Sequence, residues 1–205
     1  MATRSALPQL EQIDPRTRAR IEQAVLDTFS VAEFHKVKLI DIARRANVSL
    51  QTIYKYYGDK ESLLFSALET WLAKLAVRLF DHLQGMDNYK EKLRKVFWIV
   101  FDFFEKTPEV AQLIMSSIYL NTWRNTDTFR QPELMGLFMR VIGEGRAQGM
   151  LTDEVDEKTI LDIIIGTASR TVTMWIIRGK QGKLTDRAGP LFELLWRAVA
   201  KTGKH

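Results

Sequence analysis

The sequence contains no cysteine, which excludes disulfides, thiolate metal sites and cysteine nucleophiles. A chain without cysteine suits a reducing compartment, so we expect a cytoplasmic protein. Proline and glycine are also scarce, with 5 and 11 among 205 residues, and this argues against linker-rich and turn-rich all-β chains. The three histidines, His35, His82 and His205, are scattered. No set of metal ligands can be assembled from them, and we expect neither a metal nor a cofactor.

Long apolar runs are missing as well. The most apolar run that we identify, 96–104, has nine residues and contains Asp102. A helix needs about 20 apolar residues to span a bilayer, and the first 15 residues lack the apolar core of a signal peptide. We therefore predict no membrane partner, and we interpret 96–104 as part of a buried helix.

Sequence motifs of catalysis are absent too. We find no G-x-S-x-G, no phosphate-binding loop and no H-E-x-x-H. The G-x-G at Gly143 and Gly145 has no preceding strand and is therefore not a dinucleotide fingerprint. We predict no catalytic residues and no enzyme.

What the sequence does contain is helical periodicity along nearly its whole length. The pair Asp14-Pro15 predicts a helix start, because a carboxylate caps free N–H groups and proline suits the first helical position. A short periodic piece around 39–46 ends at Asn47, and Ser49 is placed to cap the helix that follows. Further helices are expected at 60–84, 88–106, 109–120, 132–148, 156–178 and 188–202. The prediction is an all-α fold of about nine helices, with a small N-terminal three-helix unit joined to a larger bundle.

The positive charge is concentrated in one window. The chain has 30 Lys and Arg against 25 Asp and Glu, a net charge of +5. Residues 34–60 alone hold six basic and two acidic side chains, for +4. This window therefore indicates where an anionic partner would bind.

Two short helices separated by Asn47-Val48-Ser49 have the dimensions of a helix-turn-helix. Asn47 is one of the few residues that tolerate a left-handed backbone at the turn. The N-terminal turn of the second helix carries Leu50, Gln51 and Thr52, at the end that a recognition helix inserts into the major groove. Tyr54, Tyr56 and Lys55 offer phosphate contacts, whereas Tyr57 is expected to pack inside. The predicted DNA-binding residues are Lys38, Arg44, Ser49, Leu50, Gln51, Thr52, Tyr54, Lys55, Tyr56 and Lys60.

The segment IDIARRANVSLQTIYKYYGDKESLL (40–64), preceded by LDTF (26–29), closely resembles the DNA-binding region of TetR-family transcriptional regulators. The resemblance implies a homodimer on double-stranded DNA with a palindromic operator, most often a repressor, and a C-terminal domain that binds an inducing small molecule. We accordingly expect a DNA-binding domain over 1–62 and a ligand-binding and dimerisation domain over 63–205. Three positions depart from the family pattern: Glu33 and Asn47 replace glycines, and Lys38 replaces the Thr or Ser that caps a helix.

The C-terminal region contains a helix, 88–106, that is apolar nearly all round and must be surrounded by protein. Its aromatic side chains suit the wall of a cavity for a largely apolar effector, and dense core packing is the alternative for each of them. Asp102 and Arg170 interrupt apolar helices and are candidate polar anchors, with an interhelical pair or a solvent-exposed edge as the alternative. The predicted ligand-binding residues are Phe97, Phe101, Phe104, Met115, Trp123, Arg170, Met174 and Trp175.

The last two helices carry more apolar surface than one bundle can bury, and a two-fold dimer interface would cover the surplus. The predicted interface residues are Ile165, Ser169, Val172, Leu191, Leu195, Trp196 and Val199. The function predicted from all these features is a ligand-responsive, sequence-specific DNA-binding regulator. The alternative is a helical small-molecule-binding or scaffold protein without specific DNA binding.

Overall fold

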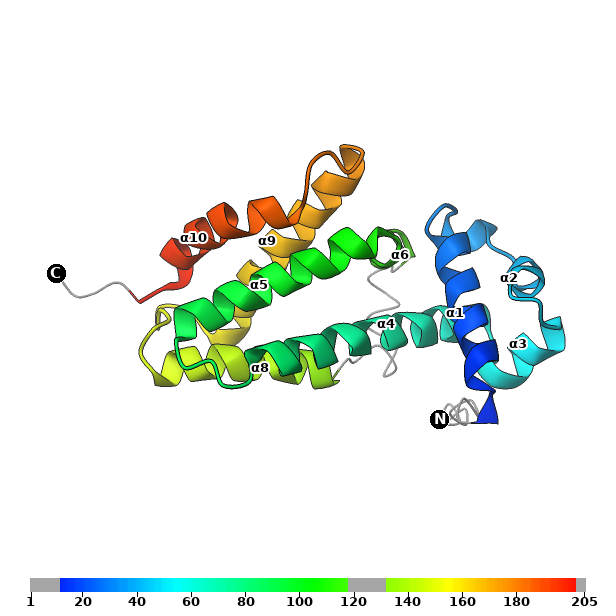
Figure 1. The fold of residues 1–205 in the computed structure, drawn as a ribbon, viewed down its shortest axis with the longest axis horizontal. Helices are drawn as coiled ribbons and strands as arrows, with labels where there is room; N and C mark the ends of the chain where they lie inside the picture. Colours follow the sequence, from blue (N-terminus) through cyan, green and yellow to red (C-terminus); the bar gives the residue numbers. More distant parts are fainter. Residues whose placement is uncertain (1–11, 118–131, 202–205) are drawn as a thin grey trace. The chain divides into compact units, whose positions relative to one another are not determined.

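The computed structural model describes residues 12–117 and 132–201, and within them it has nine α-helices and no strand. This confirms the all-α prediction (Figure 1). The helices are α1 (Pro15–Phe29), α2 (Leu39–Arg45), α3 (Leu50–Tyr57), α4 (Lys60–Leu83), α5 (Tyr89–Lys106), α6 (Pro108–Ser117), α8 (Pro132–Ala147), α9 (Glu157–Ile177) and α10 (Ala188–Val199).

The predicted helix starts are confirmed by side-chain caps. Asp14 accepts a hydrogen bond from the backbone N–H of Thr17 at 2.9 Å, and Pro15 follows it as the first helical residue. Ser49 accepts from the N–H of Thr52 at 3.0 Å and opens α3. Each cap satisfies an N–H group that has no partner inside its helix.

The last helix ends earlier than its periodicity predicts. Helix α10 stops at Val199 because Ala200 is extended and forms an isolated antiparallel bridge with Leu151. The N–H of Thr152 donates to the carbonyl of Val199 at 2.8 Å, and the N–H of Lys201 donates to the carbonyl of Met150 at 2.9 Å. The backbone therefore leaves the helix to pair with the loop before α9.

The chain divides into two compact units. Of the described residues, one unit contains 12–71 and 112–117, and the other contains 72–111 and 132–201. Helix α4 is continuous across the division between Trp71 and Leu72. The domain boundary expected at 62/63 stays a prediction.

The first unit has a small apolar core. Helix α1 contacts α2, and α2 contacts α3. Ile21, Phe29, Ile42 and Ile53 are fully buried between these helices. The burial fixes which sides of α2 and α3 remain at the surface.

The second unit is organised around α5, which contacts α8, α9 and α10. The rings of Phe97 and Phe101 lie 4.6 Å apart, and Phe192 of α10 lies 6.5 Å from Phe97. This confirms that the apolar helix expected at 88–106 is buried by protein.

Helix α9 is long and apolar enough to cross a membrane by length and composition, although the sequence pattern predicts no span. A third of its most apolar window is buried inside this chain. Core helices of soluble proteins share this length and composition.

Candidate functional site

The turn between α2 and α3 has the geometry that the sequence predicts. Asn47 has a φ of 54°, in the left-handed region, which confirms its role at the turn. The N–H of Val48 donates to the carbonyl of Ala43 at 3.0 Å and closes the end of α2. The turn therefore sets the direction in which α3 leaves α2.

The two other departures from the family pattern have local consequences. Lys38 stands at the N-terminal cap of α2 and makes no side-chain capping bond. Glu33 has an ordinary φ of −64°, and the chain turns after it through a short 3₁₀ segment, Phe34–Lys36. The corner after α1 is therefore made without a glycine.

Helix α3 has one buried side and one exposed side. Ile53 and Tyr57 are fully buried against the rest of the unit, as expected for Tyr57. Burial and, to a smaller extent, the nearby Glu22 carboxylate together raise the pKa of the Tyr57 phenol to about 12. These two residues hold the helix, so its other side is left to contact a partner.

The exposed side of α3 carries polar chemistry. Gln51 and Lys55 are exposed, and Tyr54 is 53% exposed. Tyr56 is half-buried, and the ammonium of Lys55 lies 4.8 Å from the centre of its ring. Amide, phenol and ammonium groups on one face of a capped helix supply both base-edge and phosphate contacts.

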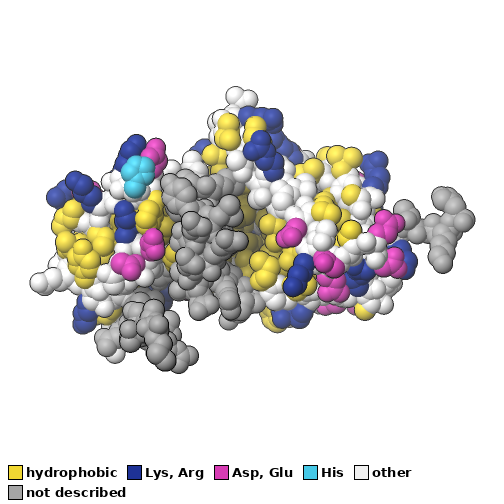
Figure 2. All heavy atoms as spheres, turned by 180° about the vertical axis from the view of Figure 1, so that it is seen from behind, with side chains coloured by type: hydrophobic (Ala, Val, Ile, Leu, Met, Phe, Trp, Pro, Cys, Tyr) yellow, Lys and Arg dark blue, Asp and Glu magenta, His cyan; other side chains and the backbone are white. Residues whose placement is uncertain are grey.

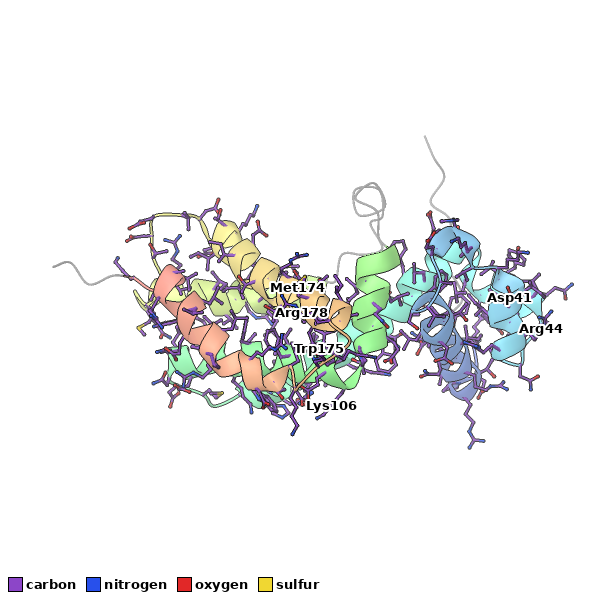
Figure 3. The ribbon with its side chains drawn as sticks, turned by 90° about the horizontal axis from the view of Figure 1, so that it is seen from above. Asp41, Arg44, Lys106, Met174, Trp175 and Arg178 are labelled. Carbon is purple, nitrogen blue, oxygen red and sulfur yellow. The ribbon has the colours of Figure 1, made fainter. Side chains whose placement is uncertain are left out.

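Basic side chains extend this surface beyond α3. Lys38 and Arg44 are exposed, and Figure 3 shows Arg44 with Asp41 on the side of α2 that faces away from α1. Arg44 and Asp41 are 3.7 Å apart, an exposed pair that competes weakly with a phosphate. Figure 2 shows Lys and Arg side chains, in dark blue, at the surface of the N-terminal helices.

Lys60 has a different environment from the other predicted DNA contacts. Its ammonium donates to the carbonyl of Phe34 at 2.8 Å and to that of Val37 at 3.0 Å. It also lies 4.4 Å from the centre of the Phe34 ring. The structure thus gives Lys60 a role in holding the corner between α1 and α2, and a DNA contact stays a prediction.

The predicted ligand residues fall into separate environments. Phe97 and Phe101 are buried together in α5, and Phe104 is half-buried. On α9, Trp175 is buried and donates from Nε1 to the carbonyl of Gly182 at 2.9 Å. Trp123 lies outside the described residues, and so does the side chain of Met115.

The two candidate polar anchors for a ligand, Arg170 and Asp102, differ in burial. Arg170 of α9 is exposed. Met174, four residues later, is half-buried and is labelled in Figure 3. Asp102 is buried and forms an interhelical pair with Arg78 of α4 and a bond with Lys106. Burial opposes ionisation of Asp102, but the bonds from Lys106 and Arg78 hold its pKa below the usual value. The carboxylate is therefore already engaged by cations.

The predicted dimer residues are only partly at the surface. Val172, Leu195 and Val199 are buried inside this chain, so their apolar character is explained without a partner. Ile165, Leu191 and Trp196 are half-buried, and Ser169 is exposed. The most exposed apolar side chains of α9 and α10 are others, absent from the predicted set: Ile163 at 40%, Ile177 at 68% and Leu194 at 59%.

Two family models match consecutive parts of the chain. The model described as bacterial regulatory proteins, tetR family, matches residues 23–67. The model described as YsiA-like protein, C-terminal region, matches residues 68–198. Together the two models match residues 23–198, which include parts of both units.

Relatives and solved structures agree with these matches. The fatty acid metabolism regulator protein of Bacillus subtilis is 24% identical over 179 residues, 86% of this chain and 92% of the relative. The structure of the fatty acid degradation regulator FadR from Bacillus halodurans has a TM-score of 0.80 at 21% identity, over 90% of this chain and 96% of that one. The Bacillus subtilis FadR structure in complex with stearoyl-CoA has a TM-score of 0.78 at 21% identity, over 91% and 99% of the two chains. These structural likenesses show that the fold is shared.

Proposed function

The chain belongs to the TetR family of bacterial regulatory proteins, and from this premise we propose which surfaces bind DNA, partner and effector. It is a ligand-responsive, DNA-binding transcription regulator. We propose that α3 is the helix that enters the major groove. The observation that carries this proposal is that α3 is capped and held by its buried side while Gln51, Tyr54 and Lys55 stand exposed on the other.

The roles proposed for the exposed residues of α3 and α2 follow from their chemistry. Gln51 lies in the first turn, where the amide can bond an adenine edge with two hydrogen bonds. Lys55, Lys38 and Arg44 carry charges that neutralise phosphates and fix the position of the helix without reading sequence. Removing Gln51 therefore changes base preference, whereas removing a basic residue weakens binding to every sequence.

We propose a homodimer that binds a palindromic operator. The support is the exposed apolar surface of Ile163 and Ile177 on α9 and Leu194 on α10, which a second copy would cover. A two-fold dimer places two copies of α3 about one helical turn of DNA apart, roughly 34–36 Å, and each copy reads one half-site.

We propose an effector of the long-chain acyl-CoA class, with an apolar acyl chain and a polar, anionic head group. The support is the relatedness to a regulator of fatty acid metabolism and the fold shared with a structure that contains stearoyl-CoA. The apolar side chains of α5 and α9, among them Phe104 and Met174, offer half-buried surface for an acyl chain. The effector would release DNA by changing the spacing of the two α3 helices.

We also infer a cytoplasmic protein without catalytic activity, because the matched family is one of bacterial regulatory proteins and the Bacillus subtilis relative is a regulator protein. The alternative from the sequence, a helical binding or scaffold protein without specific DNA use, makes an opposite prediction for DNA binding. It predicts weak binding that is the same for all sequences.

The test is selection of bound duplexes from random DNA, followed by release with stearoyl-CoA. We expect a palindromic consensus for the wild type and altered bases at one position of each half-site for Gln51→Ala. The matched control is Gln84→Ala, an exposed glutamine just after α4, for which we expect the wild-type consensus. An unchanged consensus for Gln51→Ala would refute base reading by that residue, and no enrichment for the wild type would favour the scaffold alternative.

A further inference from the structure

Two carboxylates, Glu22 and Asp102, are buried in the part of the chain that the structure describes. Both are bonded to α4, although one belongs to α1 and the other to α5. A buried carboxylate is costly unless cations and donors surround it, so each must be held in a defined geometry.

Glu22 is the centre of a three-residue network in the first unit. Its Oε1 accepts from Nε of Arg18 at 2.8 Å and from the hydroxyl of Thr70 on α4 at 2.9 Å. A guanidinium nitrogen of Arg18 donates to the same hydroxyl at 2.9 Å. The three groups close a ring, and the Thr70 hydroxyl also lies 3.1 Å from a second acceptor, the carbonyl of Ser66 within α4. A rotation or slide of α4 against α1 breaks the contacts of Thr70 with Glu22 and Arg18.

Asp102 makes the corresponding contact in the second unit. It bonds the guanidinium of Arg78 on α4, and Lys106 donates to the same oxygen at 2.9 Å. Asp102 is 6% exposed, so the pair is shielded from solvent and restricts α4 against α5.

The two contacts lie close together along α4. Thr70 and Arg78 are eight residues apart, roughly 12 Å along the helix axis, and the division between the units at Trp71 and Leu72 lies between them. Apolar packing alone permits neighbouring helices to slide, whereas directional hydrogen bonds fix register. The same helix is therefore fixed in register to one helix of each unit.

We propose that Glu22 and Asp102 are positioning residues that join α4 to α1 and to α5, so that a displacement of α4 carries α1 and the DNA-binding helices with it. This inference rests on the proposed function, because the displacement originates from an effector bound by the C-terminal domain. It assigns the coupling between effector and DNA to two side-chain contacts with α4.

The first test is the ratio of the DNA dissociation constants measured with and without stearoyl-CoA. Thr70→Val keeps the side-chain shape and removes the hydroxyl that bonds Glu22. Its matched control is Thr28→Val, which removes a half-buried hydroxyl bonded only to the carbonyl of Ala24 within α1. Allosteric ratios are commonly about 5 to 150, and we expect Thr70→Val to lower the ratio to less than about a third of the wild-type value. Thr28→Val should leave it unchanged.

The contact between Asp102 and Arg78 of α4 is tested by a second pair of variants. Asp102→Asn removes the charge that Arg78 and Lys106 share, and Asp153→Asn removes the charge of an exposed ion pair with Lys201 far from α4 in sequence. We expect a lowered ratio for Asp102→Asn alone. If these residues only stabilise the fold, the melting temperature falls while the ratio stays at its wild-type value, and that result would overturn the proposal.

A measurement that needs neither DNA nor effector separates this inference from the proposed function. Because the chain has no cysteine, spin labels can be attached at Ala19→Cys on α1 and Glu61→Cys on α4, both exposed positions of the first unit. We expect a narrow distance distribution in the otherwise wild-type chain and a broader one with Thr70→Val, but not with Thr28→Val. An unchanged distribution with Thr70→Val would overturn the inference. Failure of stearoyl-CoA to release DNA from the wild type would instead contradict the proposed effector.

Discussion

Gly145 of α8 lies against the ring of Tyr89, the first residue of α5, and its replacement by alanine gives a sharp test of the packing in the second unit. A Cβ at this position would lie 2.2 Å from Cζ and 2.3 Å from the hydroxyl oxygen of Tyr89. The tyrosine has no free space to yield, because it is 4% exposed and its hydroxyl is buried. Either the ring or the helix must move.

The magnitude follows from two opposing contributions. Alanine is favoured over glycine inside a helix by about 1 kcal/mol, whereas overpacking a buried site typically costs about 1–3 kcal/mol. A contact as short as 2.2 Å falls at the upper end of that range, so we expect Gly145→Ala to lower the unfolding free energy by about 2 kcal/mol. For a chain of this size this corresponds to a fall in Tm of about 4–8 °C.

Thermal unfolding followed by circular dichroism measures the effect. Gly143→Ala is the matched control in the same helix, because its Cβ would lie 3.9 Å from the nearest atom, an ordinary contact. We expect it to be neutral or stabilising by up to about 1 kcal/mol. Tyr89→Leu should reduce the penalty of Gly145→Ala in a double-mutant cycle. Equal Tm values for the Gly145 and Gly143 variants would refute the packing described here.

Three further predictions concern single side chains of the two units. Lys60→Met leaves two backbone carbonyls without their donor and should lower the unfolding free energy in urea by about 1.5–3 kcal/mol, and an unchanged stability would show that this lysine is not structural. Lys55→Ala should weaken binding to all duplexes and reduce the salt slope by about 1, and a changed base preference would contradict its role as a phosphate contact. The lowered pKa of Asp102 means that its ionised form stabilises the fold above the unfolded pKa of about 3.9 and that this contribution is lost as pH falls further. The difference in unfolding free energy between the wild type and Asp102→Asn should therefore be largest near neutral pH and shrink in acid, and a difference independent of pH would rule this out.

The features predicted correctly from the sequence are those that depend on neighbouring residues. The cap at Asp14, the left-handed turn at Asn47 and the cap at Ser49 each satisfy backbone groups within a few residues, so local chemistry determines them. The exposed face of α3 also depends only on neighbouring residues. Ile53 and Tyr57 are four residues apart, so they lie on one side of the helix and mark it as the buried side.

The features that were missed depend on segments distant in sequence. Helix α10 ends at Val199 because of a bridge to Leu151, which no local pattern indicates. Glu22 looks like any charged residue of an amphipathic helix until Thr70, 48 residues later, is packed beside it. Periodicity shows that a helix has an apolar face but not which protein covers it. Val172 is buried inside this chain, and its place at a dimer interface stays a prediction.

The measurement that tests the central claim most directly compares two dissociation constants at physiological salt. One is for the duplex enriched by selection, and the other is for a scrambled duplex of the same length and composition. If α3 reads base edges through Gln51 and its neighbours, the selected duplex should bind at least about a thousandfold more tightly. Equal affinities for the two duplexes would contradict the account.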